Sequence, residues 1–274
     1  MKTLFVTDLD GTLMRDDKTV SELSVDILNR LIGQGVCLTY ATARTFDSAS
    51  GITKDINFEL PVITRNGTVL VNPRTGEKLE IAVFGAGELA AIRQCLEGMS
   101  VPGFSTTYLD GQEWKIYLKG RMNQGFRHYL EEHAEDKRLR MKEKEEAWFE
   151  GKVCYFTFIA DRQELEPLYE RVAGYPELNC VFQQDKYRPE YWLEICPKNA
   201  TKAQAIGRVK ELQGCDRVVV FGDSLNDISM FRTADAAYAV ENGMEELKQI
   251  ATGIIGENNA DGVARWLQQF GSCS

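Results

Sequence analysis

Thr3-Leu4-Phe5-Val6-Thr7-Asp8-Leu9-Asp10-Gly11-Thr12 is a short apolar run followed at once by two acids and a glycine. Its β-rich first half predicts a buried strand over residues 3–7. A helix is expected after Ser21, because leucine and isoleucine recur at helical spacing up to two closing glycines. Residues 36–41 predict the next strand, and residues 61–64 predict a third. Strand, helix and strand at this spacing form a βαβ unit, which implies a parallel sheet covered by helices.

The same alternation returns at the far end of the chain. There a helix over 203–212 precedes a strand over 217–221, and a further strand is expected over 236–240. Between these halves, helices and hairpin-like strands follow one another in a different pattern. We therefore expect a doubly wound, mainly parallel α/β core made of residues 1–81 and 190–274. An inserted α+β domain is expected over residues 82–189.

Composition excludes several classes of protein. The chain has 274 residues, of which 43% are hydrophobic and 27% charged, as in ordinary globular proteins. Its net charge of −9 makes a nucleic-acid partner unexpected, because such proteins need a basic face. No apolar run is long enough for a membrane helix, and Asp8 comes too early for a signal peptide. We expect a cytoplasmic protein with no membrane partner.

Cysteine and histidine use argues against disulfides and zinc. The seven cysteines are odd in number, widely spaced and without a Cys-x-x-Cys pair, so we expect reduced thiols. The only histidines, His128 and His133, are five residues apart and do not share a helix face.

Four of the expected strands end in polar side chains. In open α/β sheets, ligands bind beyond the carboxyl ends of the strands, so these groups should converge if the strands share one sheet. They are Asp8 and Asp10, Thr42 and Arg44, Arg65 and Asn66, and finally Asp223, Asn226 and Asp227.

The acids in this set suggest metal-assisted chemistry on phosphorus. Clustered carboxylates repel one another unless a cation lies among them, and Mg²⁺ favours carboxylates, waters and substrate phosphate. One acid can attack phosphorus while another protonates the leaving oxygen. Gly11 would let backbone N–H groups approach a phosphate, Thr42 supplies a hydroxyl, and Lys202 supplies a positive charge.

These motifs resemble those of the haloacid dehalogenase-like phosphatases. Asp8-Leu9-Asp10-Gly11-Thr12 is similar to their first motif, Ala41-Thr42-Ala43-Arg44 to the second, Lys202 fits the third, and Gly222-Asp223-Ser224-Leu225-Asn226-Asp227 is similar to the fourth. Order and spacing agree over nearly the whole chain. Within the superfamily, the sequence most resembles the Cof-type phosphatases of subclass IIB.

The resemblance implies a role for each motif residue. Asp8 would be the nucleophile and a Mg²⁺ ligand, and Asp10 the general acid/base with its carbonyl on the metal. Asp223 would be the third metal ligand. Gly11, Thr42, Lys202 and Asn226 would bind the phosphoryl group, supported by Asp227. Ala43 stands where related phosphatases usually have glycine, which leaves the reach of Arg44 open.

The resemblance also implies a Rossmann-like core and a cap. Caps of this superfamily enter either after the first motif or after the third strand. Only eight residues separate Thr12 from Ser21, whereas 135 lie between Asn66 and Lys202. The cap is therefore of the second kind, type C2, and would cover the phosphate site and contact the leaving group.

Two interpretations are open for the role of some residues. Arg44 either contacts substrate or pairs with an acid, and Asn66 either contacts substrate or only makes an Asn-Gly turn. Several cap residues could meet a polar substrate, although aromatic residues at alternate strand positions are more often core: Trp114, Lys115, Tyr117, Lys186, Tyr187, Arg188 and Trp192. The charged stretch 131–146 is read as a solvated helix face and loop.

The expected function is Mg²⁺-dependent hydrolysis of small phosphorylated metabolites through an aspartyl phosphate. Sugar phosphates are the first expectation for the substrate class. A phosphomannomutase-like phosphotransferase on the same scaffold is the alternative, and a non-catalytic metabolite sensor is a weaker one. The motifs do not separate these activities. A monomer and a homodimer are equally open.

Overall fold

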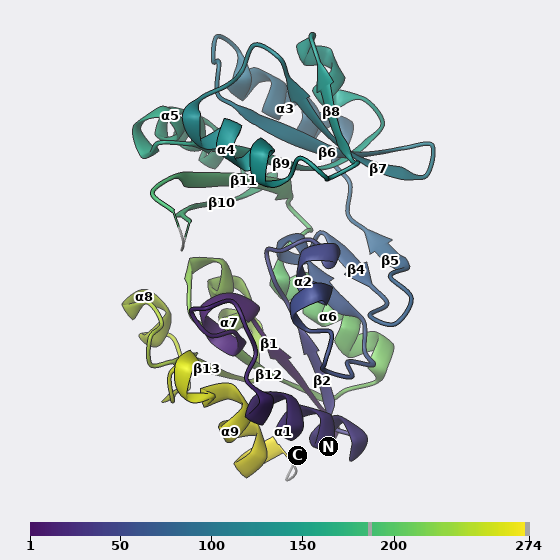
Figure 1. The fold of residues 1–274 in the computed structure, drawn as a ribbon, viewed down its shortest axis with the longest axis vertical. Helices are drawn as coiled ribbons and strands as arrows, with labels where there is room; N and C mark the ends of the chain where they lie inside the picture. Colours follow the sequence, from purple (N-terminus) through teal and green to yellow (C-terminus); the bar gives the residue numbers. More distant parts are fainter. Residues whose placement is uncertain (186–187, 272–274) are drawn as a thin grey trace. The chain divides into compact units, whose positions relative to one another are not determined.

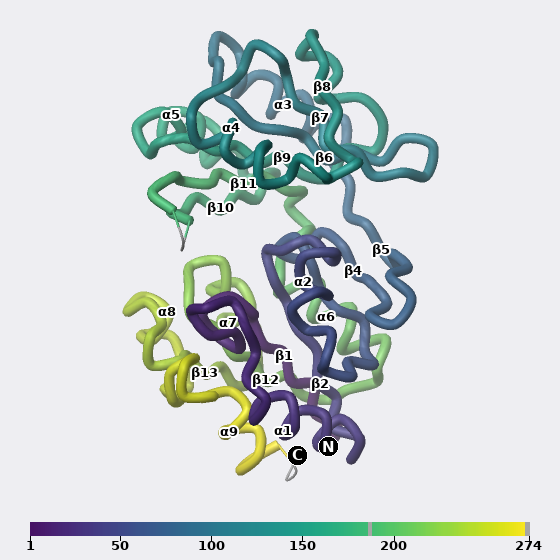
Figure 2. The backbone as a smooth tube through the Cα atoms, viewed as in Figure 1, coloured from purple at the N-terminus to yellow at the C-terminus, as the bar shows by residue number. Residues whose placement is uncertain are grey.

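The computed structural model describes residues 1–185 and 188–271. The chain divides into two compact units. One contains Met1–Ile81 and the chain from Ala200 onward, and the other contains Ala82–Asn199. Figure 2 shows this in colour, since the purple N-terminal segments lie with the yellow C-terminal ones, while the teal segments from the middle of the chain belong to the other unit.

The first unit is built on a five-stranded parallel sheet (Figure 1). Its first strand, β1, lies at the apolar run that opens the sequence and has β12 and β2 as its neighbours. The order across the sheet is β14-β13-β12-β1-β2. The strands are β1 (Thr3–Thr7), β2 (Cys37–Tyr40), β12 (Arg217–Gly222), β13 (Ala236–Val240) and β14 (Gly253–Ile255).

Helices cover both faces of this sheet, as the doubly wound prediction requires. On one face, α1 (Glu22–Gly33) packs against α9 (Gly262–Phe270), and both bury apolar residues against the sheet. On the other face lie α6 (Lys202–Gln213) and α7 (Ile228–Thr233). Ser21 caps α1, because its hydroxyl accepts a hydrogen bond from the backbone N–H of Ser24. The short helices α2 (Phe46–Ile52) and α8 (Glu245–Lys248) complete the unit.

The strand expected over 61–64 does not join the parallel sheet as a full member. Strand β3 (Val62–Thr64) pairs antiparallel with β4 (Val69–Val71), which pairs with β5 (Lys78–Ile81). A single parallel bridge between Ala41 and Ile63 ties this small sheet to the end of β2. The bridge keeps the end of β3 beside the end of β2.

The second unit is an α+β module around a six-stranded sheet of order β10-β11-β9-β6-β7-β8. Helices α3 (Ala86–Leu96) and α5 (Arg162–Ala173) share one apolar cluster with it, and α4 (Gln124–Glu132) contributes to another. The strands are β6 (Gly103–Leu109), β7 (Gln112–Leu118), β8 (Leu139–Lys142), β9 (Lys152–Ala160), β10 (Leu178–Gln184) and β11 (Tyr191–Pro197).

Two expectations for this unit are wrong. The core was expected to resume at residue 190, but β11 pairs with both β9 and β10 and so belongs to the inserted sheet. Its central place in that sheet moves the return to the core to Ala200. The stretch 131–146 is mostly exposed, as expected, but it is not helix and loop alone, because it contains strand β8, which pairs with β7.

Within the described residues, no helix is long and apolar enough to cross a bilayer. The six cysteines of that part of the chain are free thiols, and Cys273 lies outside it.

Candidate active site

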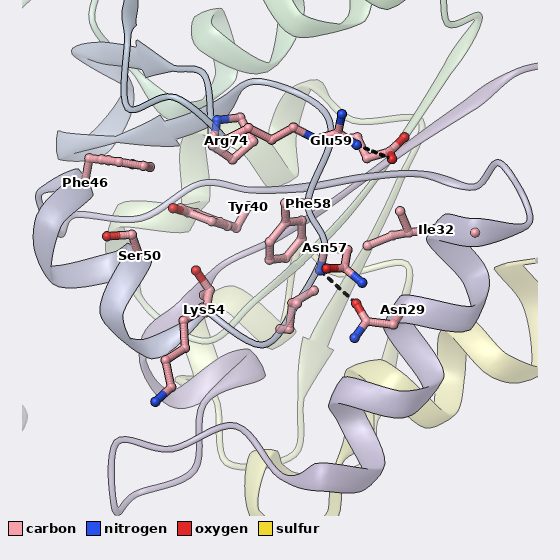
Figure 3. Close-up of a pocket in the computed structure, with 14 residues that line it drawn as sticks. Asn29, Ile32, Tyr40, Phe46, Ser50, Lys54, Asn57, Phe58, Glu59 and Arg74 are labelled. Carbon is pink, nitrogen blue, oxygen red and sulfur yellow. Dashed lines mark hydrogen bonds and ion pairs between the residues drawn. The ribbon is translucent and has the colours of Figure 1, made fainter.

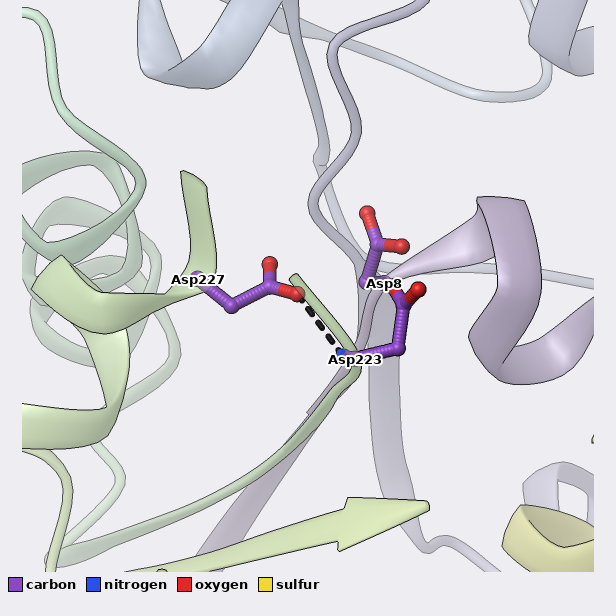
Figure 4. Close-up of side chains that lie close together, drawn as sticks. All are labelled: Asp8, Asp223 and Asp227. Atoms are coloured by element: carbon purple, nitrogen blue, oxygen red, sulfur yellow. Dashed lines mark hydrogen bonds between the residues drawn. The ribbon is translucent and has the colours of Figure 1, made fainter. Parts of the chain in front are cut away.

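The carboxyl ends of β1 and β12 bring the first and fourth motifs together. These strands pair in parallel with Thr7 opposite Phe221, and the backbone N–H of Asp8 donates to the Phe221 carbonyl at 2.9 Å. Asp8 therefore lies beside the residues that follow β12. The carboxylates of Asp8, Asp223 and Asp227 each place one oxygen within 4.8 Å of the others, and all three are buried (Figure 4).

Lys202 lies between two of these acids. Its Nζ is 2.7 Å from Asp8 Oδ1 and 2.7 Å from Asp227 Oδ1, and its side chain is fully buried. Burial by itself would lower the pKa of Lys202, but the charges of Asp227 and Asp8 outweigh it and raise the pKa above its ordinary value. The ammonium group thus stays charged. The N-cap of α6 fixes this position, since the Thr201 side chain accepts from the Gln204 N–H.

The Asp227 carboxylate has hydrogen-bond partners at both of its oxygens. Its Oδ1 faces Lys202, and its Oδ2 accepts hydrogen bonds from the backbone N–H groups of Asp223 at 3.0 Å and Ser224 at 3.2 Å. Both oxygens are occupied. The Asp227 carboxylate can lie this close to the backbone only because residue 222 is a glycine. An added Cβ at position 222 would lie 2.6 Å from Asp227 Oδ2.

The remaining two acids fit a hard divalent cation. Asp8 and Asp223 offer carboxylate oxygens close together, and such oxygens are the ligands that Mg²⁺ prefers. Thr12 donates its hydroxyl to Asp223 Oδ1 at 3.1 Å and so orients this carboxylate. Sequence reasoning did not single out the Thr12 side chain, although it belongs to the first motif.

Arg44 pairs with an acid. Its Nε donates to Asp10 Oδ2 at 2.7 Å, its Nη2 to Asp10 Oδ1 at 2.6 Å, and its Nη1 to Ser48 Oγ at 2.9 Å. The departure at Ala43 does not impede this contact, because Ala43 has no positive φ. The second motif therefore reaches the first through the side chain of Arg44.

Thr42 is buried in the same loop, and its hydroxyl oxygen already accepts one hydrogen bond. The backbone N–H of Arg44 donates to Thr42 Oγ1 at 3.1 Å, which fills one acceptor position and leaves the O–H able to donate. The Thr42 N–H bonds to the carbonyl of Ile63 at 2.9 Å, and the Asn66 N–H bonds to the Thr42 carbonyl at 2.9 Å. These bonds fix Thr42 to the end of β3.

Asn66 makes the expected turn, and its side chain also contacts Asn226. It adopts a left-handed φ of 53° in the tight turn from β3 to β4, and its Oδ1 accepts from Asn226 Nδ2 at 3.2 Å. Asn226 Oδ1 in turn accepts from Ser224 Oγ at 2.7 Å. Gly67 continues the turn at φ 103°, where a Cβ would lie 2.2 Å from the Thr201 carbonyl oxygen. The turn is thereby packed against the start of α6.

Gly11 adopts a left-handed conformation with φ 77°, which glycine enters without steric cost. Its carbonyl accepts a hydrogen bond from Asn242 Nδ2 at 2.8 Å. Asn242 also accepts from the N–H of Asn258, so the segment after the first motif is tied to the C-terminal part of the unit. Sequence reasoning assigned no role to Asn242.

The candidates in the inserted unit are mostly structural. Tyr117 and Trp192 pack against the cluster that contains Phe104 and Tyr129, and Lys115 forms an ion pair of 2.9 Å with Asp136. Trp114 packs on the opposite apolar cluster. Arg188 pairs with Glu132, and Lys186 and Tyr187 lie outside the described residues.

Known proteins resemble this chain over almost its full length. It is 24% identical to 5-amino-6-(5-phospho-D-ribitylamino)uracil phosphatase YitU of Bacillus subtilis, with 97% of each chain covered. It is 26% identical to the HMP-PP phosphatase of Yersinia pestis, over 98% of this chain and 96% of the relative. The structure of the subclass IIB sugar phosphatase BT4131 superposes with a TM-score of 0.75 at 20% identity, covering 99% of both chains.

A family model described as haloacid dehalogenase-like hydrolase matches residues 5–267, which is most of the chain and includes all four motifs. The match confirms the expected enzyme superfamily, and the fold of a parallel core with an inserted antiparallel module agrees with it. The chain therefore belongs to the haloacid dehalogenase-like hydrolases, in their Cof-type group.

Proposed function

We propose that the protein is a Mg²⁺-dependent phosphatase that hydrolyses small phosphorylated metabolites through an aspartyl phosphate on Asp8. The observation that carries this proposal is the position of Asp8, which lies against the Lys202 ammonium at 2.7 Å and beside the Asp223 carboxylate. A cation and a metal-binding acid on either side of one carboxylate are what attack on a phosphate dianion requires.

Asp8 and Asp10 would divide the chemistry between them. A carboxylate oxygen of Asp8 attacks phosphorus, and the bond from phosphorus to the leaving oxygen breaks as Asp10 gives that oxygen its proton. Asp10 then takes a proton from water, whose oxygen attacks the phosphoryl group and restores the Asp8 carboxylate. Two acids in separate surroundings can perform these opposite tasks. Arg44 holds the Asp10 carboxylate through both of its oxygens.

Other residues of the chain would bind and orient the phosphoryl group. Lys202 supplies a fixed positive charge that requires no rearrangement during the reaction, and Thr42 supplies its hydroxyl hydrogen. Gly11 and Asn226 are proposed as further contacts. Asp8, Asp223 and the Asp10 carbonyl would hold Mg²⁺, which would neutralise charge on the transferring group when bound.

The choice of substrate is proposed to lie with the inserted unit, as a cap of type C2. The relatives named above are phosphatases for a ribityl phosphate intermediate, for HMP-PP and for sugars, and all of these substrates are small metabolites. We therefore propose the same class here, with sugar phosphates first. A cytoplasmic location is proposed with it.

The test is phosphate release from a panel of phosphorylated sugars and vitamin precursors. Wild type, Asp8→Asn and the exposed control Asp26→Asn are compared with Mg²⁺, with chelator, and after Mg²⁺ is restored. We expect release that needs both Mg²⁺ and Asp8 and that the control retains. Full activity in Asp8→Asn or in metal-free buffer would overturn the mechanism. Transfer of phosphate to a second sugar, without release, would identify a mutase instead.

A further inference from the structure

The turn that follows β13 is bonded to the backbone of two motifs at once. Asn242 Nδ2 donates to the carbonyl of Gly11, in the first motif, at 2.8 Å. Two residues later, the backbone N–H of Met244 donates to the carbonyl of Asp223, in the fourth motif, at 2.7 Å. Residues 242–244, which we call the β13 turn, therefore connect the two motifs that carry the proposed metal ligands.

The bond from Asn242 acts at the most flexible position of the first motif. Gly11 has φ 77° and ψ 4°, and a glycine can leave this conformation at little steric cost because it has no Cβ. The torsions of Gly11 set the position of Asp10 relative to Thr12, and the Thr12 hydroxyl donates to Asp223 Oδ1 at 3.1 Å. A hydrogen bond from outside the segment therefore selects the conformation in which these three residues meet.

The β13 turn also packs closely against the backbone of Asp223. A Cβ at Gly243 would lie 3.3 Å from Asp223 Cα and 2.9 Å from the carbonyl oxygen of Val240, so the turn can lie this close because residue 243 is a glycine. The Gly243 N–H closes the turn on the Val240 carbonyl at 2.8 Å. Val240 ends β13, which pairs in parallel with β12, so the sheet holds the turn beside Asp223.

A second asparagine holds the side chain of Asn242 in place. Asn242 Oδ1 accepts from the backbone N–H of Asn258 at 3.0 Å. The Asn258 side chain is buried, and its Nδ2 donates to the Met14 carbonyl and to Asp16 Oδ1, both at 2.9 Å. Because the amide oxygen and the amide nitrogen of Asn242 both have partners, its rotamer is fixed and its N–H is directed at the Gly11 carbonyl.

We infer that Asn242 is a positioning residue and that the β13 turn is a brace between the first and fourth motifs. The brace holds the Asp10 carbonyl and the Asp223 carboxylate at the spacing that a divalent cation needs. It acts through hydrogen bonds to the backbone, without contact to substrate or metal. The inference rests on the proposed function, because it concerns the metal site proposed there.

The test measures Mn²⁺ binding to the whole protein, by electron paramagnetic resonance of the free ion, and the Mg²⁺ concentration that gives half-maximal activity. Asn242→Asp keeps the acceptor for Asn258 and removes the donor to Gly11, whereas Asn242→Ala removes both. We expect each variant to bind Mn²⁺ about 10-fold more weakly and to need about 10-fold more Mg²⁺. The added charge of Asn242→Asp would by itself attract the cation, so weaker binding there reports the lost donor. Asn242 is exposed, so both variants should fold.

Two matched controls separate positioning from a general fastening of the fold. Asn29 of α1 makes the same pair of bonds elsewhere, since it accepts from the backbone N–H of Asn57 at 2.7 Å, as Figure 3 shows, and donates to the Asp55 carbonyl at 2.8 Å. Asn259 is exposed and donates to Asp16 Oδ2 at 2.8 Å, beyond the first motif. Asn29→Asp and Asn259→Ala should lower the midpoint of thermal unfolding but leave Mn²⁺ affinity and the Mg²⁺ requirement within about twofold of wild type.

Asp223→Asn separates a failure of the brace from a failure of the proposed function. This variant should lose Mn²⁺ binding at the site, because it removes a charged ligand. No Mn²⁺ bound by wild type, or wild-type affinity in Asp223→Asn, would overturn the metal site itself. Loss of binding in Asp223→Asn together with wild-type affinity in Asn242→Asp would overturn the brace alone. Weakening of the same size in either control would also overturn it, since fastening of the fold would then explain the effect.

Discussion

Arg44 and Asp10 form a two-point ion pair, in which Arg44 Nε is 2.7 Å and Nη2 is 2.6 Å from the two oxygens of the Asp10 carboxylate. The planar guanidinium matches both carboxylate oxygens at once, which a lysine cannot do. This pair fixes the rotamer of the proposed acid/base. It also occupies both of its oxygens, so Asp10 must exchange at least one of these bonds to reach a leaving group.

The first prediction concerns this pair. Arg44→Ala should lower kcat by about 10- to 100-fold, because Asp10 loses the contact that orients it. Arg44→Lys should recover only part of the loss, since it restores the charge without the two-point geometry. Steady-state kinetics with the best substrate measure both. Equal kcat in wild type and Arg44→Ala would show that the pair has no part in turnover.

Much of the site was predictable because the motifs follow parallel strands. The register of β1 and β12 dictates that Asp8 and Asp223 meet, and strand patterns are read directly from apolar runs. The sequence did not show which group Arg44 contacts, because the reach of a long side chain depends on its rotamer. The boundary between the inserted unit and the core was placed too early, at residue 190, since nothing in the local residues tells which of two sheets the segment 191–197 joins.

The second prediction concerns Lys202, which lies between Asp8 and Asp227. Lys202→Met should reduce turnover to background and lower the free energy of unfolding by about 3 kcal/mol, because two buried carboxylates lose their common cation. Adding Asp227→Asn should restore part of the stability but none of the activity. Denaturant unfolding and phosphate release measure the two effects. Lys198→Met is the control, and comparable losses there would contradict the prediction.

The raised pKa of Lys202 predicts how the stability difference between wild type and Lys202→Met depends on pH. The folded pKa is raised above the ordinary value of about 10.4, so the stabilising charge is fully present below that pH. It is lost only as the pH rises through the folded pKa. The stability difference between wild type and Lys202→Met should therefore be constant from neutral pH to about 10. A difference that disappears below pH 9 would contradict it.

The third prediction concerns Gly222, the last residue of β12. Gly222→Ala places a methyl group 2.6 Å from Asp227 Oδ2, so Asp227 must move and release Lys202. We expect a loss of about 2 kcal/mol in stability, as for other overpacked sites, together with a large loss of kcat.

Gly207→Ala in α6 is the matched control. Nothing lies within 4 Å of a Cβ at that position, and alanine favours helix, so this variant should be neutral or slightly more stable. Thermal unfolding and kcat are measured for both. Similar behaviour of the two variants would show that the contact between Gly222 and Asp227 does not matter.

The fourth prediction concerns Asp136, the acid in the stretch that the sequence suggested was merely solvated. Its Oδ1 accepts from Arg138 Nε at 2.7 Å, and its Oδ2 lies 2.9 Å from Lys115 Nζ. Burial raises its pKa, but hydrogen bonds from Arg138 and Lys115 outweigh burial and hold the pKa well below its ordinary value. The ionised form therefore stabilises the fold.

For a lowered carboxyl pKa, the stabilisation is present above the unfolded value and is lost as the pH falls through the folded value. Asp136→Asn should thus be about 2 kcal/mol less stable than wild type at pH 7, and this difference should shrink below about pH 4. Denaturant unfolding at several pH values measures it, with exposed Asp26→Asn as control. A difference that persists unchanged in acid would mean that Asp136 acts through packing, because a neutral carboxyl and an amide fill the same space.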